Sequence, residues 1–483
     1  MKNSSDVMIS DEGTTFKDVV LAILKVVMEG FARQLGMLLN AMDDALAVKF
    51  RLEGTMRGWE SIGKRERTVT TLFGLQIRYR RREYRRRDVT GGGCFYPLDE
   101  RLGLKAGERF CPLVQHIAVG LASKLSFRDA AFVMERYLGV PVSHQEIHRW
   151  AREAGKAREA EQKEEEEKVL SQCGTGSKTT DVVVIEADGM IVSLQRSEKR
   201  KAELKLGVMH EGWEAETSAG KRFCLIGKEC WGGDLSAQEF WERGLVRLME
   251  KCNLDKIQRL ILNGDGDEWI REGEKYLGAE WYLDRYHVHR AVIEGLRNQP
   301  KRRVKVLEAL GAGDLRRLEE LLEEGVEAAK DPQECQKVEK LRQYLKANWD
   351  GLVDWRQRPG AQPEGAKGLG AIEGQVRHIA AARMKRRGAN WTKRGANNML
   401  QLRLLGEMDQ LGSWLYRWQS RRWPEVTERA SQLTAKEVVK RLAGVNLGGW
   451  LRASLPILGT KYRFSPLGEA LYKLSHTLSL EAC

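Results

Sequence analysis

The sequence lacks the features that mark small secreted proteins and membrane proteins. Its eight cysteines are spread over 483 residues and include no Cys-x-x-Cys pair, so reduced thiols explain them better than a disulfide framework or a structural zinc. No apolar run approaches the ~18 residues that span a bilayer. The apolar stretch 19–28 is interrupted by Lys25, and no small-residue cleavage site closes it. We therefore expect a cytoplasmic protein without a membrane partner.

What the sequence has in excess is positive charge. The formal net charge is +13, which favours a polyanionic partner and leaves the fold open. Nucleic acid is the leading candidate, and an anionic membrane surface is the second. A chain of 483 residues also exceeds the usual size of one hydrophobic core, so we expect several structural units.

The N-terminal part combines helices with a basic β-ribbon. Apolar residues recur at helical spacing over 15–51, where they form either a local core or a dimer contact. A Thr- and Arg-rich hairpin then turns at Phe73-Gly74. Residues 61–90 hold ten Lys or Arg against three acids. Because alternate residues of a strand face opposite sides, these arginines must emerge on both sides of the ribbon, and we expect the ribbon to be exposed. Phosphate binding is the functional interpretation. The alternative is a solvated sheet edge that its charges protect from pairing. The candidate DNA-binding residues are Arg78, Arg80, Arg82, Arg85, Arg86 and Arg87.

Two capped helices follow the ribbon. Ser126 can cap a helix that Gly139 ends, and Ser143 with Glu146 forms the capping box of a second helix. This order is typical of a helix-turn-helix, although two helices that merely pack together look the same. The Glu-rich run 159–168 is expected to be a solvated helical linker. The polar face of the second helix offers Gln145, His148, Arg149 and Arg152 to DNA.

Two β-branched runs end in acids. Residues 181–188 predict a buried strand that ends at Asp188-Gly189 and feeds a hairpin with 190–195. A second run, 260–267, contains Asp265 and Asp267. Carboxylates at one edge of a sheet suit phosphoryl chemistry with two metal ions, because hard oxygen ligands bind Mg²⁺. An acid and a glycine after a strand also occur in plain turns.

A third strand is predicted at 280–284, followed by a helix that contains His287 and His289. Histidines two apart are poor partners for one metal on a helix, where the useful spacing is four. We interpret Asp284 and His287 as groups that support the acids without holding the metal. Residues 292–355 have helical texture and no evident chemistry, and a further helix then carries Glu373 in its first turn. Arg383, Lys385 and Arg386 follow it and are candidates to hold a DNA strand.

Several of these stretches resemble the insertion-sequence transposases of the ISLre type. They are 185–189 (IEADG), 263–266 (NGDG), 282–288 (YLDRYHV), 372–374 (IEG) and 383–391 (RMKRRGANW), with 73–74 and 97–100 in the N-terminal part. The resemblance covers about residues 60–410. Asp284-x-x-His287 also matches a signature of D-D-E transposases that include the Mutator-like group.

The resemblance implies an α/β fold with a ribonuclease H-like mixed sheet and an all-α insertion, preceded by the helical, β-ribbon and helix-turn-helix DNA-binding region. It implies catalytic and metal-holding roles for Asp188, Asp265 and Glu373, with Asp267 as the alternative second acid. It also implies Mg²⁺ or Mn²⁺ as cofactor, and cleavage and strand transfer at terminal inverted repeats. A non-catalytic DNA-binding regulator and a nuclease that does not join strands are the rival functions.

The expected partners are double-stranded DNA, as element ends and target, and further copies of the chain on that DNA. From the N-terminus we expect a helical segment (1–60), a basic β-ribbon (61–112), a helix-turn-helix with an acidic linker (113–172), the first part of the catalytic core (173–291), an all-α insertion (292–364), the last part of the core (365–420) and a helical tail (421–483).

Overall fold

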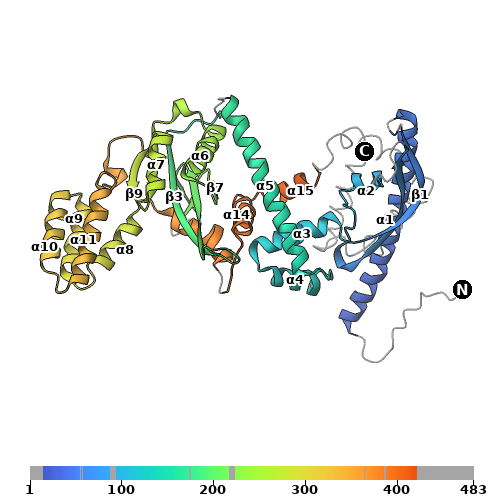
Figure 1. Cartoon of the computed structure of the whole chain (residues 1–483), viewed down its shortest axis with the longest axis horizontal. Coiled ribbons are helices and arrows are strands. Elements are labelled where there is room, and N and C mark those ends of the chain that lie inside the picture. The colour runs from blue at the N-terminus through green and yellow to red at the C-terminus, as the bar shows by residue number, and fades with distance from the viewer. Residues whose placement is uncertain are drawn as a thin grey trace, which may run out of the picture. The chain divides into compact units, whose positions relative to one another are not determined.

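The computed structural model describes residues 15–420, except for residues 55, 57, 88–93, 173–175, 217–222, 364 and 386–387 (Figure 1). The described chain forms two compact units: residues 15–118, 131–143 and 416–420 make up the first, and residues 119–130 and 144–415 make up the second. The helical tail expected at 421–483 lies outside the described residues. None of the described helices is long and apolar enough to cross a bilayer.

In the first unit a long helix lies along a two-stranded ribbon. Helix α1 (Phe16–Glu53) packs against β2 (Gln76–Arg86), which pairs antiparallel with β1 (Trp59–Thr70). The approach is close: a Cβ added to Gly36 of α1 would lie 2.4 Å from the carbonyl oxygen of Arg78. The short 3₁₀ turn η1 (Leu72–Gly74) joins the two strands. Its left-handed residues, Phe73 and Gly74, lie where the sequence predicts the hairpin turn.

Part of one face of the ribbon is covered, so its arginines are not all exposed as expected, although Arg85 on that face is. Ile77 and Tyr79 of β2 are buried against α1 and helix α2 (Pro97–Arg101). On that side Asp99 accepts hydrogen bonds from the Tyr79 hydroxyl at 2.8 Å and from the guanidinium groups of Arg67 and Arg81. These two arginines are therefore neutralised inside the unit. Helix α3 (Pro112–Lys124) follows.

Two long helices flank the sheet of the second unit. Helix α5 (His144–Gln172) packs against α14 (Lys393–Glu407), and a Cβ added to Gly155 would lie 2.3 Å from the Asn398 carbonyl oxygen. The Glu-rich run 159–168 belongs to α5 and is not a free linker. Its Gln162 is buried, and Glu161 and Glu165 pair with the buried Arg158 at 3.1 Å. Helix α4 (Phe127–Arg136) precedes α5.

A five-stranded sheet lies at the centre of the second unit. Its strand order is β7-β4-β3-β8-β9, formed by β3 (Val182–Ser193), β4 (Lys201–His210), β7 (Glu229–Gly233), β8 (Arg259–Gly264) and β9 (Glu280–Leu283). Strand β4 runs antiparallel to β3 and β7, whereas β8 runs parallel to β3 and to β9. The predicted mixed α/β architecture is thus confirmed.

Strand β3 passes through the position where the sequence predicts a turn. It continues past Asp188-Gly189 to Ser193, and it pairs with β4 along the way, with Asp188 opposite Leu206. Its parallel pairing with β8 ends earlier, at Glu186 opposite Asn263. Asp188 therefore lies within a continuous strand, just beyond the last residue that β8 covers.

Helices surround this sheet. Helices α6 (Ala237–Lys251) and α7 (Glu268–Leu277) precede β8 and β9, and a small hairpin pairs β5 (Trp213–Ala215) with β6 (Phe223–Leu225). After β9 comes a helical insertion, visible in yellow and orange at one end of Figure 1: α8 (Arg285–Gly295), α9 (Pro300–Ala312), α10 (Leu315–Glu327) and α11 (Pro332–Ala347).

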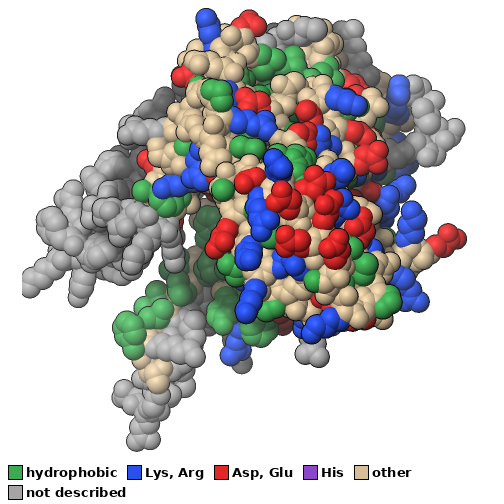
Figure 2. Space-filling model, turned by 90° about the vertical axis from the view of Figure 1, so that its left-hand side faces the viewer, with side chains coloured by type: hydrophobic (Ala, Val, Ile, Leu, Met, Phe, Trp, Pro, Cys, Tyr) green, Lys and Arg blue, Asp and Glu red, His purple; other side chains and the backbone are tan. Residues whose placement is uncertain are grey.

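The insertion shares its hydrophobic core with the sheet. One buried cluster runs from Val183 and Leu262 in the strands to Leu318 and Leu341 in the insertion. Its surface carries interspersed acids and bases (Figure 2), joined in pairs such as Arg342 with Glu323 at 2.7 Å. The chain then returns to the sheet through Trp355 of η4 (Trp355–Gln357), which is buried against β3, β8 and β9.

Candidate metal and active site

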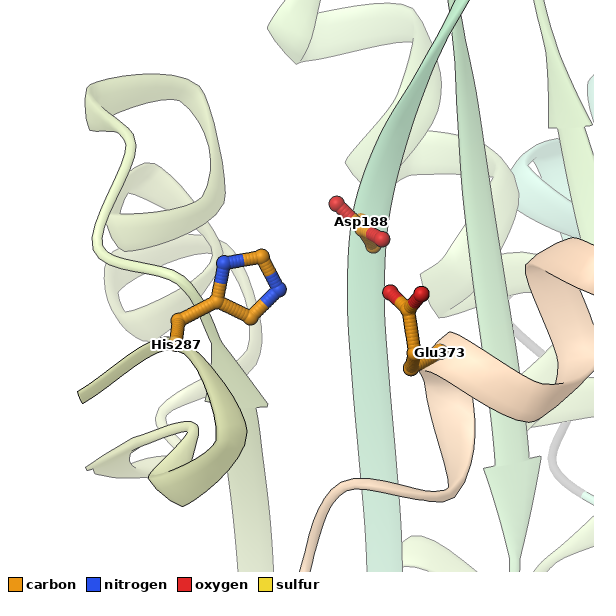
Figure 3. Close-up of side chains that lie close together, drawn as sticks. All are labelled: Asp188, His287 and Glu373. Atoms are coloured by element: carbon orange, nitrogen blue, oxygen red, sulfur yellow. The ribbon is translucent and has the colours of Figure 1, made fainter. Parts of the chain in front are cut away.

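Three side chains from distant parts of the sequence converge beside β3. Asp188 comes from the strand, His287 from the first turn of α8, and Glu373 from the short helix α12 (Ala371–Val376). Figure 3 shows the carboxylates and the imidazole pointing into a common space. One possible ligand atom from each of the three residues lies within 4.8 Å of the others. Two carboxylates and an imidazole at this separation can share a divalent cation.

Burial and neighbouring carboxylates raise the pKa of Asp188. Its side chain is about 8% exposed, and burial raises the pKa of Asp188 to about 6. The Gly189 N–H, which donates to Oδ1 at 2.7 Å, and His287 oppose that rise, whereas the carboxylates of Asp265 and Glu373 add to it. Several acids that repel one another in this way form a suitable place for a cation.

Asp265 and Asp267 lie differently at the end of β8. Asp265 follows the strand, and its Oδ1 accepts a hydrogen bond from the Asp267 N–H at 3.0 Å. The carbonyl oxygen of Asp265 accepts one from the Tyr344 hydroxyl at 2.8 Å. Asp267 is exposed and is the N-cap residue of α7. The charge of Asp265 acts on Asp188, whereas Asp265 and His287 act on Asp267; neither acid belongs to the three-residue cluster.

Asp284 and Glu186 hold the elements that carry His287 and Glu373. Asp284 is about 1% exposed; its Oδ1 caps α8 by accepting from the Tyr286 N–H at 2.7 Å, and burial raises its pKa. The buried Glu186 accepts hydrogen bonds from the N–H groups of Gly370 at 3.1 Å and Ile372 at 2.9 Å, at the start of α12. These contacts fix where the two helices begin.

Comparison with known proteins shows one family that matches the described part of the chain. A family described as "Uncharacterised protein family (UPF0236)" matches residues 9–421. The chain belongs to the UPF0236 family.

Two relatives show how far the similarity extends. A UPF0236 protein of Caldanaerobacter subterraneus subsp. tengcongensis is 25% identical over 403 residues, which cover 81% of this chain and 80% of the relative. Its name joins eleven locus designations of that organism. A Streptococcus gallolyticus protein named "UPF0236 protein in vanSb 3'region" is 27% identical over 390 residues, which cover 79% of this chain and 80% of the relative. The residues matched by the family, 9–421, span both described units.

The ribbon of this UPF0236 protein exposes most of the arginines proposed to contact DNA. Arg82 differs, because it pairs with Asp43 at 2.6 Å and with Asp44 at 2.7 Å and is partly buried. A paired arginine is a poor phosphate ligand, so Arg82 is withdrawn from that set. The exposed members are Arg78, Arg80, Arg85, Arg86 and Arg87.

The first turns of α5 also present polar side chains. Gln145, His148 and Arg152 are exposed, whereas Arg149 pairs with Glu146 at 2.5 Å and Glu153 at 2.9 Å. The inner face of this helix buries Ile147, Trp150 and Ala151, as its apolar pattern predicts.

The basic residues that follow Glu373 are only partly available to contact DNA. Arg383 is buried; its Nε donates to the Ala122 carbonyl oxygen at 2.9 Å, and its guanidinium lies about 5 Å from the ring centres of Phe127 and Trp391. Arg383 therefore holds the second unit together and is not a phosphate contact. Lys385 is exposed, and Arg386 lies outside the described residues.

Two features of the UPF0236 site were missed from the sequence. His287 has a possible ligand atom within 4.8 Å of those of Asp188 and Glu373, whereas the sequence predicts only a supporting role for it. Glu186 bonds to the start of α12, and its place two residues before Asp188 on the same strand face was the available signal.

The raised pKa of Asp188 predicts an unusual effect of pH on stability. Between about pH 4 and 6 the unfolded chain releases this proton first, so the free energy of unfolding of metal-free protein should fall as pH rises. The loss should stay complete above pH 6 and amount to at most about 3 kcal/mol. Without metal, Asp188→Asn should therefore be more stable than the unmodified protein at pH 7 and not at pH 4.

Urea unfolding with a chelator at the two pH values measures this effect, and Asp181→Asn, at the exposed position before β3, is the control. Excess Mn²⁺ should stabilise the unmodified protein and leave Asp188→Asn unchanged, because a ligand that binds only the folded state stabilises it. Equal metal effects on the two proteins would exclude Asp188 as a metal ligand.

Proposed function

We propose that this UPF0236 protein is a DNA transposase of an insertion sequence, similar to the ISLre type, that cleaves DNA at element ends and joins them to a target. The observation that carries the proposal is the convergence of Asp188 and Glu373 with His287, with the charge of Asp265 acting on the same site. A bound pair of Mg²⁺ or Mn²⁺ ions would activate the attacking oxygen and stabilise the leaving one. Asp188, Asp265 and Glu373 would hold them.

The sheet supports a ribonuclease H-like core. In the order β7-β4-β3-β8-β9 only β4 runs against the others, which is the arrangement expected of that fold. Asp188 lies on the central strand, Asp265 follows the neighbouring β8, and α12 returns to β3 after the helical insertion. The same three acids are the ones that the sequence resemblance implies.

The relatives give independent support. One relative carries eleven locus designations of a single organism in its name, and another carries four. A protein encoded at many loci of one genome is what an element that inserts new copies of itself would leave behind. Neither rival function, a DNA-binding regulator or a simple nuclease, accounts for this repetition.

The ribbon and α5 are proposed to bind double-stranded DNA, with several copies of the chain assembled on it. Phosphate contacts by exposed arginines fix position, and side chains such as Gln145 and Arg152 can reach base edges. The deciding experiment supplies the purified chain with Mn²⁺ and DNA that flanks its own gene. Joining of a 3′ hydroxyl end to a second duplex supports a transposase. Cleavage without joining indicates a nuclease, and binding alone indicates a regulator.

The exposed arginines of the ribbon should determine the salt dependence of DNA binding. Each neutralised phosphate contributes about −0.9 to the slope of log K against log salt. Replacing Arg78, Arg80 and Arg85 with Ala should therefore flatten the slope by up to about 2–3 units. Titrations of labelled duplex at several salt concentrations measure it.

A matched control removes three exposed bases from the helical insertion and should leave the slope nearly unchanged. An unaltered slope in the ribbon variant would show that its arginines only face solvent. The control positions are Lys305, Arg316 and Lys346.

A further inference from the structure

We infer that His287 is itself a ligand of the catalytic cation, which makes the site bind first-row transition ions such as Mn²⁺ in clear preference to Mg²⁺. The inference rests on the proposed function, because it concerns the same site. It departs from a site made of carboxylates alone, in which only oxygen atoms meet the metal.

The spacing of the cluster is compatible with three ligands of one ion. Ligand bonds of about 2.1 Å place two ligands of an octahedral ion roughly 3.0–4.2 Å apart. The three candidate atoms of Asp188, His287 and Glu373 lie within 4.8 Å of one another. Among the described residues, no hydrogen-bond partner is found for His287 Nε2. The imidazole therefore lies beside the two carboxylates without a direct bond from this nitrogen to either of them.

The imidazole has an unused nitrogen. His287 Nε2 is shielded from solvent and has no hydrogen-bond partner among the described residues. Figure 3 shows the ring turned toward Asp188 and Glu373. Buried polar atoms are almost always satisfied in folded proteins, so a nitrogen left over beside two carboxylates indicates a missing partner. A cation would accept its lone pair and balance the acids at the same time.

The position of His287 is set before any metal binds. Asp284, three residues before His287, caps α8 through its Oδ1, and Val288, next to His287, is buried in the core shared with the sheet. His289 lies two residues further on the same helix and is exposed. The two histidines have the same side chain on the same helix, but only His287 belongs to the cluster. His289 is therefore a matched control for substitutions of His287.

The chemical consequence concerns metal choice. Mg²⁺ demands hard oxygen ligands and gives up its water reluctantly. An imidazole nitrogen is a softer ligand than the oxygens that Mg²⁺ requires, so it favours first-row transition ions over Mg²⁺. We expect Mn²⁺ to bind at least about tenfold more tightly than Mg²⁺. His287→Ala should weaken Mn²⁺ binding by about 10–100-fold and change Mg²⁺ binding by less than about threefold, and His289→Ala should alter neither.

The test uses the full chain loaded with Mn²⁺ and reads the metal by pulsed electron paramagnetic resonance. A nitrogen coupling should be present, should change when the protein is grown with ¹⁵N-histidine, and should be lost in His287→Ala but kept in His289→Ala. The isotope arm needs no mutation, so it shows whether a histidine binds the metal even if His287→Ala does not fold, and His287 is the histidine of the described cluster.

Two results would overturn the inference, and they are distinguishable. Mn²⁺ binding that depends on Asp188 but shows no histidine coupling would remove His287 from the metal and leave the proposed function standing. Mn²⁺ binding that Asp188→Asn does not weaken would remove the whole site, and the proposed function with it.

Discussion

Asp188→Asn is expected to reduce strand cleavage by about 1,000-fold or more while changing the affinity for end DNA by less than about threefold. A metal ion at a phosphoryl-transfer site contributes several kcal/mol to the barrier, and about 1.4 kcal/mol corresponds to tenfold in rate. The substitution removes one charged ligand atom of the cluster and no exposed base of the ribbon or of α5. Binding and chemistry should therefore separate.

Asp181→Asn is the matched control for this substitution. Asp181 directly precedes the same strand, is exposed, and accepts a hydrogen bond from Gln258 away from the cluster. It should cleave at the unmodified rate. Gel assays of end cleavage and of duplex binding, made on the same protein preparations, give both quantities. If Asp188→Asn cleaves normally, the assignment of the active site to β3 fails.

The elements around the site could be predicted because local patterns specify them. Apolar runs predict β3 and β8, and the almost continuous burial over 182–188 and along β8 follows from their central place in the sheet. The sequence also predicts a strand at 280–284 with a helix after it, and β9 (Glu280–Leu283) and α8 follow this order. Each of these features depends on neighbours in sequence.

Features that depend on distant partners could not be predicted in this way. Arg82 and Arg383 looked available from local charge density, but Asp43 and Phe127, which hold them, come from other parts of the chain. The turn expected after Asp188 does not form, because β4 pairs with β3 well past that point. A glycine after an acid permits a turn without requiring one.

The convergence of His287 with Glu373 is the clearest case. The helical insertion separates the two residues in sequence, and only its packing onto the same core as the sheet returns α12 to β3. His287 and His289 are two residues apart on one helix, whereas two ligands of one metal are usually four apart. This spacing predicts that His287 is not a ligand. The partners that matter, Asp188 and Glu373, lie on other elements.

Glu186 is expected to be the most sensitive position for stability around the site. It is fully buried on β3, and its Oε2 accepts both N–H groups that begin α12, those of Gly370 and Ile372. Glu186→Leu would leave these donors unsatisfied at a cost of about 1–3 kcal/mol each, partly offset because a buried charge is removed. We expect the free energy of unfolding to fall by about 2–4 kcal/mol.

Because α12 carries Glu373, the same substitution should also weaken Mn²⁺ binding by about tenfold, the usual loss when a group that orients a ligand is removed. Glu186→Gln keeps one acceptor oxygen and should lose less of both properties. Glu214→Leu, at an exposed position of β5, should change the free energy of unfolding by no more than about 0.5 kcal/mol. Urea unfolding and Mn²⁺ titration measure the pair of effects. If Glu186→Leu unfolds and binds Mn²⁺ like the unmodified protein, then the start of α12 is held by something other than this carboxylate, and Glu373 reaches the cluster without it.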